Sequence, residues 1–300
     1  PLVAAAAALV QSRQRALGGP PLSPPVMEMR LRGTSDPMGA LNPNVTGFGS
    51  GRLNLARAVA DQQGSYSFGC GSRTVGPIAV LEGPGAERRL AFVTADAQLI
   101  VTPVNGDTLV RVARPAAPLG GIASLSRGHN GETALFVALA NQTIAGYDDW
   151  GRGLSGWPVA APGVTGFANQ EPVLGDLNGD GICDVIWGGN DGRVHAWRLC
   201  GGTVDGFPKF LVGPAENIRV AVALMDDQPG AEIIAAAPTG QVFVFNAAGA
   251  ELPGWPVLAV ARPFSPLVIP NPNRPDESMV VLTGGQGTTI VDLQGRRVLS

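Results

Sequence analysis

The pattern of hydrophobic and polar positions divides the chain into a helical first part and a longer part made of short β-runs. Residues 3–16 are rich in Ala, Leu, Gln and Arg, which favour a helix, and Gly-Gly-Pro-Pro at 18–21 ends it. Ser23 is a suitable N-cap and the prolines after it suit a first helical turn, so a second helix is expected to reach about Leu31. A third short helix is expected at 53–60.

From Gly76 onward, apolar runs of strand length alternate with turn residues, and the pattern recurs. The clearest copies are DVIWGGNDGRVHAW (184–197), EIIAAAPTGQVFVF (232–245) and MVVLTGGQGTTIVD (279–292), and the weaker ones are RLAFVTADAQLIVT (89–102) and ALFVALANQTIAGY (134–147). The central turns fall at positions 97, 142, 192, 240 and 287, which are 45, 50, 48 and 47 residues apart. A period near 48 with about four short strands per unit is typical of β-propeller blades.

A second marker recurs with the same period, as Gly156-Trp157-Pro158, Gly206-Phe207-Pro208 and Gly254-Trp255-Pro256. A propeller blade buries both faces of its sheet against its neighbours. The aromatic residue of each marker is therefore expected to pack between blades, and the proline is expected to end an edge strand.

These patterns predict a mainly β fold, a β-propeller preceded by a small helical part. About five blades are expected, and the predicted division is a helical part at 1–61, a Gly-rich linker at 62–75 and blades near 76–119, 120–170, 171–217, 218–264 and 265–300. The fifth copy lacks the aromatic marker, so the propeller is expected to be incomplete here and to continue to six or seven blades. A β-sandwich or a solenoid is the alternative architecture.

Composition narrows the possible partners. The 300 residues carry 21 Lys and Arg against 24 Asp and Glu, a net charge of −3, without a basic run. Binding to nucleic-acid phosphates needs clustered Lys and Arg, so no nucleic-acid partner is expected. The longest apolar run, at 2–10, is far shorter than the roughly 20 residues that span a bilayer. It also lacks the basic flank of a signal peptide, and we expect the chain to be part of a longer protein.

The sharpest motif is DLNGDGICD at 176–184. Asp176, Asn178 and Asp180 place side-chain oxygens at alternate positions of a tight loop, Ile182 can turn its carbonyl inward, and Asp184 closes the loop at the start of a strand. Hard Ca²⁺ takes six to eight oxygen ligands, and three carboxylates this close repel one another without a cation. The sequence therefore predicts a structural calcium site, with a metal-free acidic turn as the alternative.

This loop resembles the calcium loop of FG-GAP/VCBS-type repeats, the blades of integrin-α-like propellers. The resemblance implies that the side chains of Asp176, Asn178, Asp180 and Asp184 and the carbonyl of Ile182 are the ligands. The next copy is degenerate, with Leu224 and Gln228 at the first and third side-chain positions, although Asp226 and Glu232 remain. One calcium site is expected.

The three cysteines are too few for a disulfide scaffold. Cys183 and Cys200 flank one hairpin and are expected to lie roughly opposite each other, so either a disulfide or two reduced thiols fit, depending on the compartment. Cys70, in the Gly-rich linker, is left over.

Gly33-Thr34-Ser35 matches the tripeptide that carries the nucleophile of subtilisin-like peptidases, yet Ser35 is not expected to be catalytic. A proline follows two residues later, and a run ending in Asn-Pro cannot form the helix on which such a serine depends. The histidines that could serve as a base, His129 and His195, lie inside the β-repeats and are expected to be a turn residue and a blade residue.

Three other segments do resemble the subtilase (S8) family, in the right order. PLVAAAAALVQSRQ (1–14) is similar to the helix after the nucleophile, LSPPVMEMRLRGTS (22–35) to a following short helix, and GFGSGRLNLARAV (47–59) to the closing segment of the catalytic domain. Leu2 and Ala5 depart from the family's usual His and Gly. The resemblance implies that residues 1–61 are the end of a subtilase domain whose Asp, His and Ser lie outside this chain, so no catalytic residue is expected within it.

The sequence is thus interpreted as a fragment of a secreted or cell-surface subtilisin-like serine endopeptidase, inactive by itself, joined to a calcium-stabilised propeller. The expected partners are a peptide or protein substrate of the parent enzyme and a protein or carbohydrate ligand of the propeller, with no membrane span. The main alternative is a non-enzymatic, integrin-α-like propeller for binding or adhesion. A quinoprotein-like enzyme fits less well, because no cluster of charged cofactor ligands recurs in the blades.

Overall fold

The computed structural model describes residues 2–16, 21–33, 72–82, 88–103, 110–127, 132–161, 171–213, 218–226, 228–259, 263–271, 274–285 and 287–299. Within this part, two helices come first and five four-stranded sheets follow. The prediction of a mainly β fold is confirmed.

The helices α1 (Leu2–Ala16) and α2 (Pro24–Gly33) contact each other through a small apolar core that contains Ala6, Val10, Met27 and Leu31. The Ser23 carbonyl accepts the Met27 amide at 2.9 Å, so α2 begins directly after the expected N-cap. The third expected helix, at 53–60, lies outside the described residues. No helix in the described part of the chain is long and apolar enough to cross a membrane.

Every sheet is antiparallel, and its four strands are adjacent in chain order. The first sheet contains β1 (Thr74–Glu82), β2 (Arg88–Thr94), β3 (Gln98–Pro103) and β4 (Val110–Ala113). The second contains β5 (Ala123–Arg127), β6 (Glu132–Leu139), β7 (Thr143–Asp148) and β8 (Val159–Ala160). The third contains β9 (Val173–Gly175), β10 (Asp184–Gly188), β11 (Arg193–Trp197) and β12 (Lys209–Phe210).

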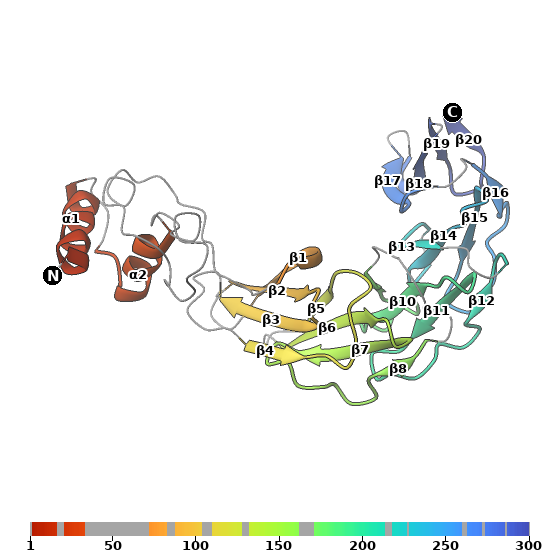
Figure 1. Cartoon of the computed structure of the whole chain (residues 1–300). Helices are drawn as coiled ribbons and strands as arrows, with labels where there is room; N and C mark the ends of the chain where they lie inside the picture. Colours follow the sequence, from red (N-terminus) through yellow and green to blue (C-terminus); the bar gives the residue numbers. More distant parts are fainter. Residues whose placement is uncertain are drawn as a thin grey trace.

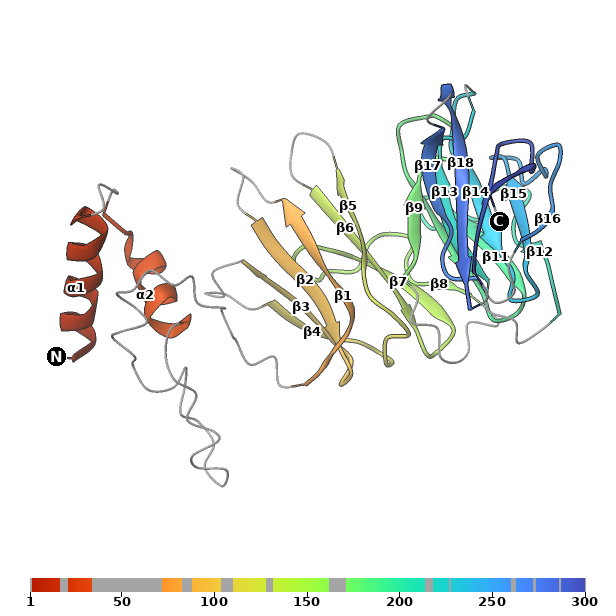
Figure 2. The same cartoon turned by 90° about the horizontal axis from the view of Figure 1, so that it is seen from above.

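The fourth sheet contains β13 (Arg219–Ala223), β14 (Glu232–Ala236), β15 (Gln241–Phe245) and β16 (Val257–Leu258). The fifth contains β17 (Leu267–Asn271), β18 (Arg274–Gly284), β19 (Gly287–Val291) and β20 (Arg297–Leu299). The sheets follow one another along a curved arc, as Figure 1 shows from the side and Figure 2 from above. The first strands of successive sheets contact one another, so they lie side by side along the array.

The turn that defined the repeat has a residue with positive φ in all five sheets. Gly192, Gly240 and Gly287 have φ of 74°, 93° and 139°, and the weaker copies adopt the same left-handed region at Ala97 (φ 61°) and Gln142 (φ 63°). Glycine suits this region because it has no Cβ to clash with the following carbonyl. The alignment of the five copies by their turns therefore agrees with the structure.

Each central strand contributes to two different cores because its side chains alternate between the two faces of its sheet. Val185 and Trp187 of β10 pack toward the second sheet, whereas Ile186 packs toward the fourth. All five residues of β10 and all five of β14 are buried. This double burial explains why both strands are continuously apolar after their first residue.

The repeated Gly-aromatic-Pro corners connect neighbouring sheets, as expected. The indole N–H of Trp157 in the second sheet donates to the Leu199 carbonyl of the third at 2.9 Å, and Trp255 of the fourth donates to Leu293 of the fifth at 2.9 Å. Phe207 contacts Phe245 edge to face, with 6.5 Å between the ring centroids.

The position of the prolines differs from the prediction. Pro158, Pro208 and Pro256 lie directly before the edge strands β8, β12 and β16 and do not end them. Each follows a cis peptide bond. Because the proline lacks an N–H, it is compatible with the first position of an edge strand, just as it is with the last.

The glycine of each corner lies against the backbone of the next sheet. A Cβ at Gly156 would overlap the Cys200 carbonyl oxygen, and a Cβ at Gly254 would overlap the Gln294 carbonyl oxygen. Both glycines also have positive φ, of 82° and 92°. A residue with a side chain would therefore be excluded from these corners by contact and by backbone conformation together.

Candidate metal loop and adjoining pocket

The five residues of the predicted metal motif lie between β9 and β10. Asp176 follows β9 directly, Asn178, Asp180 and Ile182 lie in the connecting loop, and Asp184 is the first residue of β10. The loop can turn this tightly because Gly179 and Gly181 adopt φ of 74° and 82°, in the left-handed region.

Asp176 organises the loop from within. Its Oδ1 accepts the amides of Gly179 at 2.7 Å and Asp180 at 3.2 Å, and its Oδ2 accepts the amide of Gly181 at 2.7 Å. Aspartate suits this position because a short carboxylate can bond backbone amides a few residues further along. The carboxylate therefore lies inside the curve of the loop.

Asn178 and Asp180 are bonded to each other at the rim of the loop. The Asn178 amide nitrogen donates to Asp180 Oδ2 at 2.9 Å, and the Ile182 backbone amide donates to Asp180 Oδ1 at 2.8 Å. These hydrogen bonds, that from Asn178 first, lower the pKa of Asp180, which is fully exposed to solvent. Asp180 is thus held in its ionised, oxygen-donating form.

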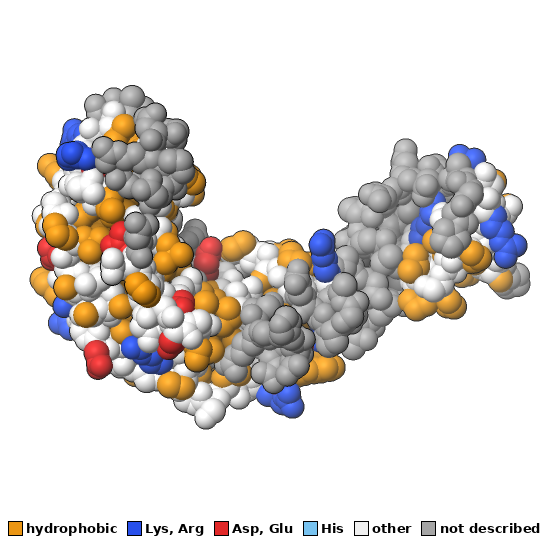
Figure 3. Space-filling model, turned by 180° about the vertical axis from the view of Figure 1, so that it is seen from behind, with side chains coloured by type: hydrophobic (Ala, Val, Ile, Leu, Met, Phe, Trp, Pro, Cys, Tyr) orange, Lys and Arg blue, Asp and Glu red, His pale blue; other side chains and the backbone are white. Residues whose placement is uncertain are grey.

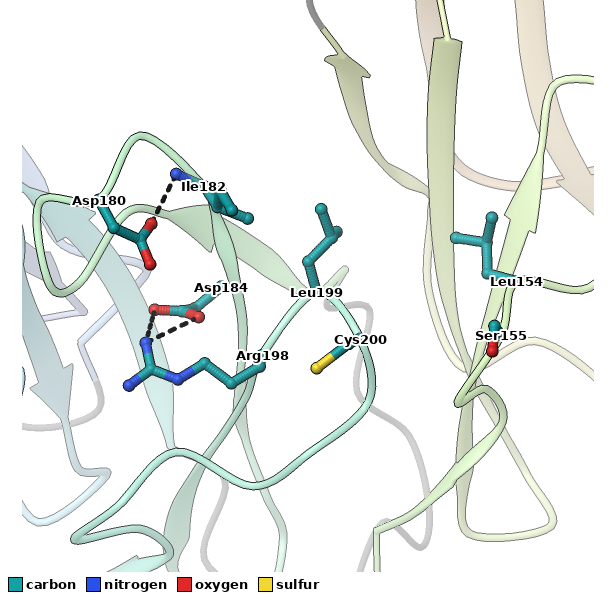
Figure 4. Close-up of a pocket in the computed structure, with 8 residues that line it drawn as sticks. All are labelled: Leu154, Ser155, Asp180, Ile182, Asp184, Arg198, Leu199 and Cys200. Carbon is teal, nitrogen blue, oxygen red and sulfur yellow. Dashed lines mark hydrogen bonds and ion pairs between the residues drawn. The ribbon is translucent and has the colours of Figure 1, made fainter.

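Asp184 has a different environment, because it is only 1% exposed. Its carboxylate accepts the Leu177 amide at 3.4 Å and lies 3.3 Å and 3.4 Å from Nη1 of Arg198 (Figure 4). Burial raises the pKa of Asp184, Arg198 opposes that shift, and the negative charge of Asp180 adds to it.

The chemical type of the predicted donor atoms fits a hard cation. It consists of oxygens from three carboxylates and one amide, with an available backbone carbonyl, and the charge of Asp180 acts on Asp184. In the part of the chain that the structure describes, however, no three His, Cys, Asp or Glu side chains form a metal-holding group. The residues predicted as ligands thus lie in one loop without forming such a group, and Asp184 pairs with Arg198.

The corresponding loop of the fourth sheet also has a buried carboxylate, although it lacks two of the expected metal ligands. This carboxylate therefore has a structural role that does not depend on a metal. Glu232, at the first position of β14, is 4% exposed, and its Oε2 accepts the Met225 amide at 2.8 Å. Burial raises the pKa of Glu232 above its usual range. A buried acid at this point of the repeat therefore fixes the preceding loop even where Leu224 and Gln228 replace two of the other expected ligands.

A pocket of about 490 Å³ adjoins the metal loop, between the second and third sheets (Figure 4). Leu154 and Ser155 form the wall from the second sheet. The third sheet contributes the loop residues Asp180, Ile182 and Asp184 and the turn residues Arg198, Leu199 and Cys200. The pocket thus combines three charged side chains with the apolar side chains of Leu154, Ile182 and Leu199.

Arg198 is the functional candidate that the sequence reasoning missed. It lies in a five-residue turn after the third strand of its sheet, and the same turn in other sheets begins with Asp148, Asn246 or Asp292. Each of those three side chains accepts two amides of its own turn. The signal was available in the aligned strings YDDWGR, FNAAGA and VDLQGR, against which WRLCGG has Arg198 in place of the acceptor.

The remaining candidate residues do not add to this site. Cys183 and Cys200 are both free, because β10 begins after Cys183 and β11 ends before Cys200, so the ladder does not pair them. His195 is buried, lies 3.0 Å from Asp191 and stacks on Trp197, as expected of a blade residue. Ser35, His129 and Cys70 lie outside the described residues.

On the face shown in Figure 3, Lys and Arg side chains are scattered and do not gather in one patch. Some of the arginines are engaged within the protein, as Arg152 is with Asp148 at 2.6 Å and Arg89 is with Asp149 at 3.0 Å.

Comparison with known proteins finds a likeness in fold but none in sequence family. No protein-family model and no curated protein sequence matches the chain. BBS1N, solved in complex with ARL6DN, is 16% identical with a TM-score of 0.51, over 82% of this chain and 71% of that one. The computationally designed Ika8 protein is 15% identical with a TM-score of 0.50, over 76% and 61%.

BamB from Moraxella catarrhalis is 16% identical with a TM-score of 0.49, over 78% of each chain. At identities this low, the likeness to BBS1N concerns architecture alone. The described sheets form a propeller-like array.

Proposed function

We propose that this chain is a propeller-type binding module, stapled by a calcium ion in the loop between β9 and β10 as in FG-GAP/VCBS repeats. The observation that supports the proposal most is the inward carboxylate of Asp176, which gathers three backbone amides and so curves the loop around its oxygen atoms. A loop with oxygens from Asp, Asn and backbone suits Ca²⁺ better than a softer metal.

In this proposal, the side chains of Asp176, Asn178, Asp180 and Asp184 and the carbonyl of Ile182 hold the ion. The ion supplies positive charge that neutralises the acidic loop, and its role is structural. The chain's own residues fix the loop: Asp176 by its amide bonds, and Asp184 by its burial at the start of β10. Millimolar calcium outside cells suits such a site, which supports the secreted or cell-surface location inferred from the sequence.

Replacement of Asp180 by Ala tests the calcium proposal. In saturating calcium, about 100-fold above Kd, the wild type should melt about 5 °C higher than in EDTA, because a ligand that binds only the native state stabilises it. Asp180→Ala should lose most of this shift, and because Asp180 is exposed, the substitution should leave the melting temperature in EDTA close to that of the wild type. The measurement is differential scanning calorimetry with and without calcium.

The matched control is Asp226→Ala, in the corresponding loop of the fourth sheet, where Leu224 and Gln228 replace two of the expected ligands. It should keep the full calcium shift. An equal calcium shift in Asp180→Ala and wild type would rule out this loop as the binding site.

The binding role rests on the propeller-like architecture and on the pocket beside the loop. Propellers act through surfaces at the ends and sides of their sheets, and BBS1N was solved in a complex with another protein. By analogy we favour a protein ligand here, and the pocket of about 490 Å³ gives it an apolar wall next to charged side chains.

We further propose that the helices are the end of a subtilisin-like peptidase domain. Val3 and Leu9 of α1 are 61% and 49% exposed although α1 is rich in apolar residues, as expected of a helix whose other partners belong to a larger domain. A fluorophosphonate probe, which labels activated serines, should leave Ser35 of this chain unlabelled. Labelling of Ser35 would overturn the alignment and the assignment of the catalytic serine to another part of the parent protein.

A further inference from the structure

The turn that follows β11 begins with Arg198 and lacks the side-chain hydrogen bonds that its counterparts in other sheets make. Asp148 Oδ1 accepts the amides of Trp150 and Arg152 at 2.9 Å and 2.8 Å, and Asn246 and Asp292 act in the same way in the fourth and fifth sheets. Arg198 has no acceptor atom, so it cannot replace these bonds. The turn nevertheless keeps its backbone bonds, from Arg198 N to Gly202 O and from Gly201 N to Arg198 O.

The arginine has a partner outside its own turn. Its Nη1 lies 3.3 Å and 3.4 Å from the two carboxylate oxygens of Asp184, whose side chain is 2% exposed, whereas the Arg198 side chain is 35% exposed. A buried carboxylate is unfavourable unless charge or hydrogen bonds compensate for its lost hydration. Arg198 provides that charge from the solvent side.

The pairing occurs in the sheet whose loop keeps all the expected calcium ligands. In sequence the loop before β14 also carries three acidic residues, Asp226, Asp227 and Glu232, but Leu224 and Gln228 replace two of its ligands, and its turn begins with the neutral Asn246. The arginine is thus found beside the loop with the complete ligand set. Its contact with Asp184 gives it a role there, whereas it has no side-chain role in its own turn.

We propose that Arg198 is an internal counter-ion of Asp184. Its guanidinium competes with calcium for the Asp184 carboxylate and thereby lowers the affinity of the loop for calcium. This inference rests on the proposed calcium site. Without the ion, the guanidinium stabilises the carboxylate. When the ion binds, Asp184 turns its oxygens to the metal, and the guanidinium moves away into the pocket that it already lines. The release of Arg198 opposes binding, so the loop responds only at higher calcium concentrations.

The test compares Arg198→Gln with wild type by isothermal titration with calcium and by thermal melting in EDTA. Arg198→Gln should bind calcium about tenfold more tightly, because a repelling charge and a competitor for Asp184 are both removed. In EDTA it should melt about 3 °C lower or more, because the buried carboxylate has lost its partner. A structural residue without this role would lower the melting temperature without tightening the binding of calcium.

Two further variants complete the design. Arg152→Gln, which breaks a pair with Asp148 in the equivalent turn of the second sheet, should leave the calcium affinity unchanged. Arg198→Lys keeps the charge and should bind calcium within about threefold of wild type. If Arg198→Gln does not fold, Arg198→Lys replaces it in the test. Tenfold tighter calcium binding by Arg198→Lys would then overturn the inference.

The outcomes separate the two proposals. If wild type binds calcium and Arg198→Gln binds it no more tightly, the counter-ion role is wrong and the calcium site stands. If neither protein binds calcium, the calcium site itself is wrong, and the inference fails with it.

Discussion

Substitution of Gly156 by Ala should lower the free energy of unfolding by about 2–5 kcal/mol, a large effect for a single methyl group. About 1–2 kcal/mol comes from holding a residue with a Cβ in the left-handed region, and the rest from forcing the corner away from the next sheet. The new Cβ would overlap the Cys200 carbonyl, and a backbone atom cannot move aside without shifting the turn that carries it. Urea denaturation followed by circular dichroism measures the loss.

The control lies three residues away in the same connection. Gly153 does not have a positive φ, and nothing lies within 4 Å of a Cβ placed on it. Gly153→Ala should therefore stay within about 1 kcal/mol of wild type. Equal losses from the two substitutions would mean that the close approach between sheets does not limit this corner.

Trp255→Ala should cost about 3–5 kcal/mol, the usual range for removing a large aromatic side chain from a core. Trp255 is 7% exposed, packs in the core between the fourth and fifth sheets and donates its indole N–H to the Leu293 carbonyl. The substitution leaves both a cavity and an unbonded carbonyl. Calorimetric melting measures the effect, and a shift of several degrees is expected for a chain of this size.

Two variants separate the contributions of packing and hydrogen bonding. Trp255→Phe keeps most of the apolar contact and copies the natural corner at Phe207, so it should cost only about 1–2 kcal/mol. Trp150→Ala removes an indole that is 56% exposed and should cost less than about 1 kcal/mol, although Arg89 lies over its ring. If Trp255→Ala cost no more than Trp150→Ala, the corner aromatic would not be what holds these sheets together.

The sequence predicted those parts of the fold that depend on local conformation. The turns at 97, 142, 192, 240 and 287 each contain a residue with positive φ, so an alignment by turn residues identified equivalent positions even where Ala97 and Gln142 replace glycine. The corner aromatics were recognised for the same reason, since each comes with the glycine and proline that shape its backbone. The tight acidic loop at 176–184 was recognisable because Asp, Asn and Gly fix its curvature within nine residues.

Features that depend on neighbouring segments could not be predicted in the same way. The Arg198–Asp184 pair continues the register of the β10–β11 hairpin, in which Val185 pairs with Trp197, so the hairpin places the two residues opposite each other. What made Arg198 unusual was the comparison of four turns, which the sequence reasoning did not make. The pairing of Cys183 and Cys200 was left open because the ends of a short ladder cannot be placed to within one residue from sequence alone. The proline corners were placed at the wrong end of the edge strands for the same reason.

The double burial of the central strands has a consequence for how this chain selects one alignment of its strands. A strand with one polar face is locked, because a slip by one residue would bury polar side chains and expose apolar ones. After their first residues, β10 and β14 have no polar face, so a slip would exchange the residues of two adjoining cores and expose nothing. The information that prevents slippage must therefore lie outside the hydrophobic pattern. It is held by the left-handed turns, which fix each hairpin, and by the mismatch in size between such residues as Trp187 and Ile186, which cannot trade places between cores of different shape.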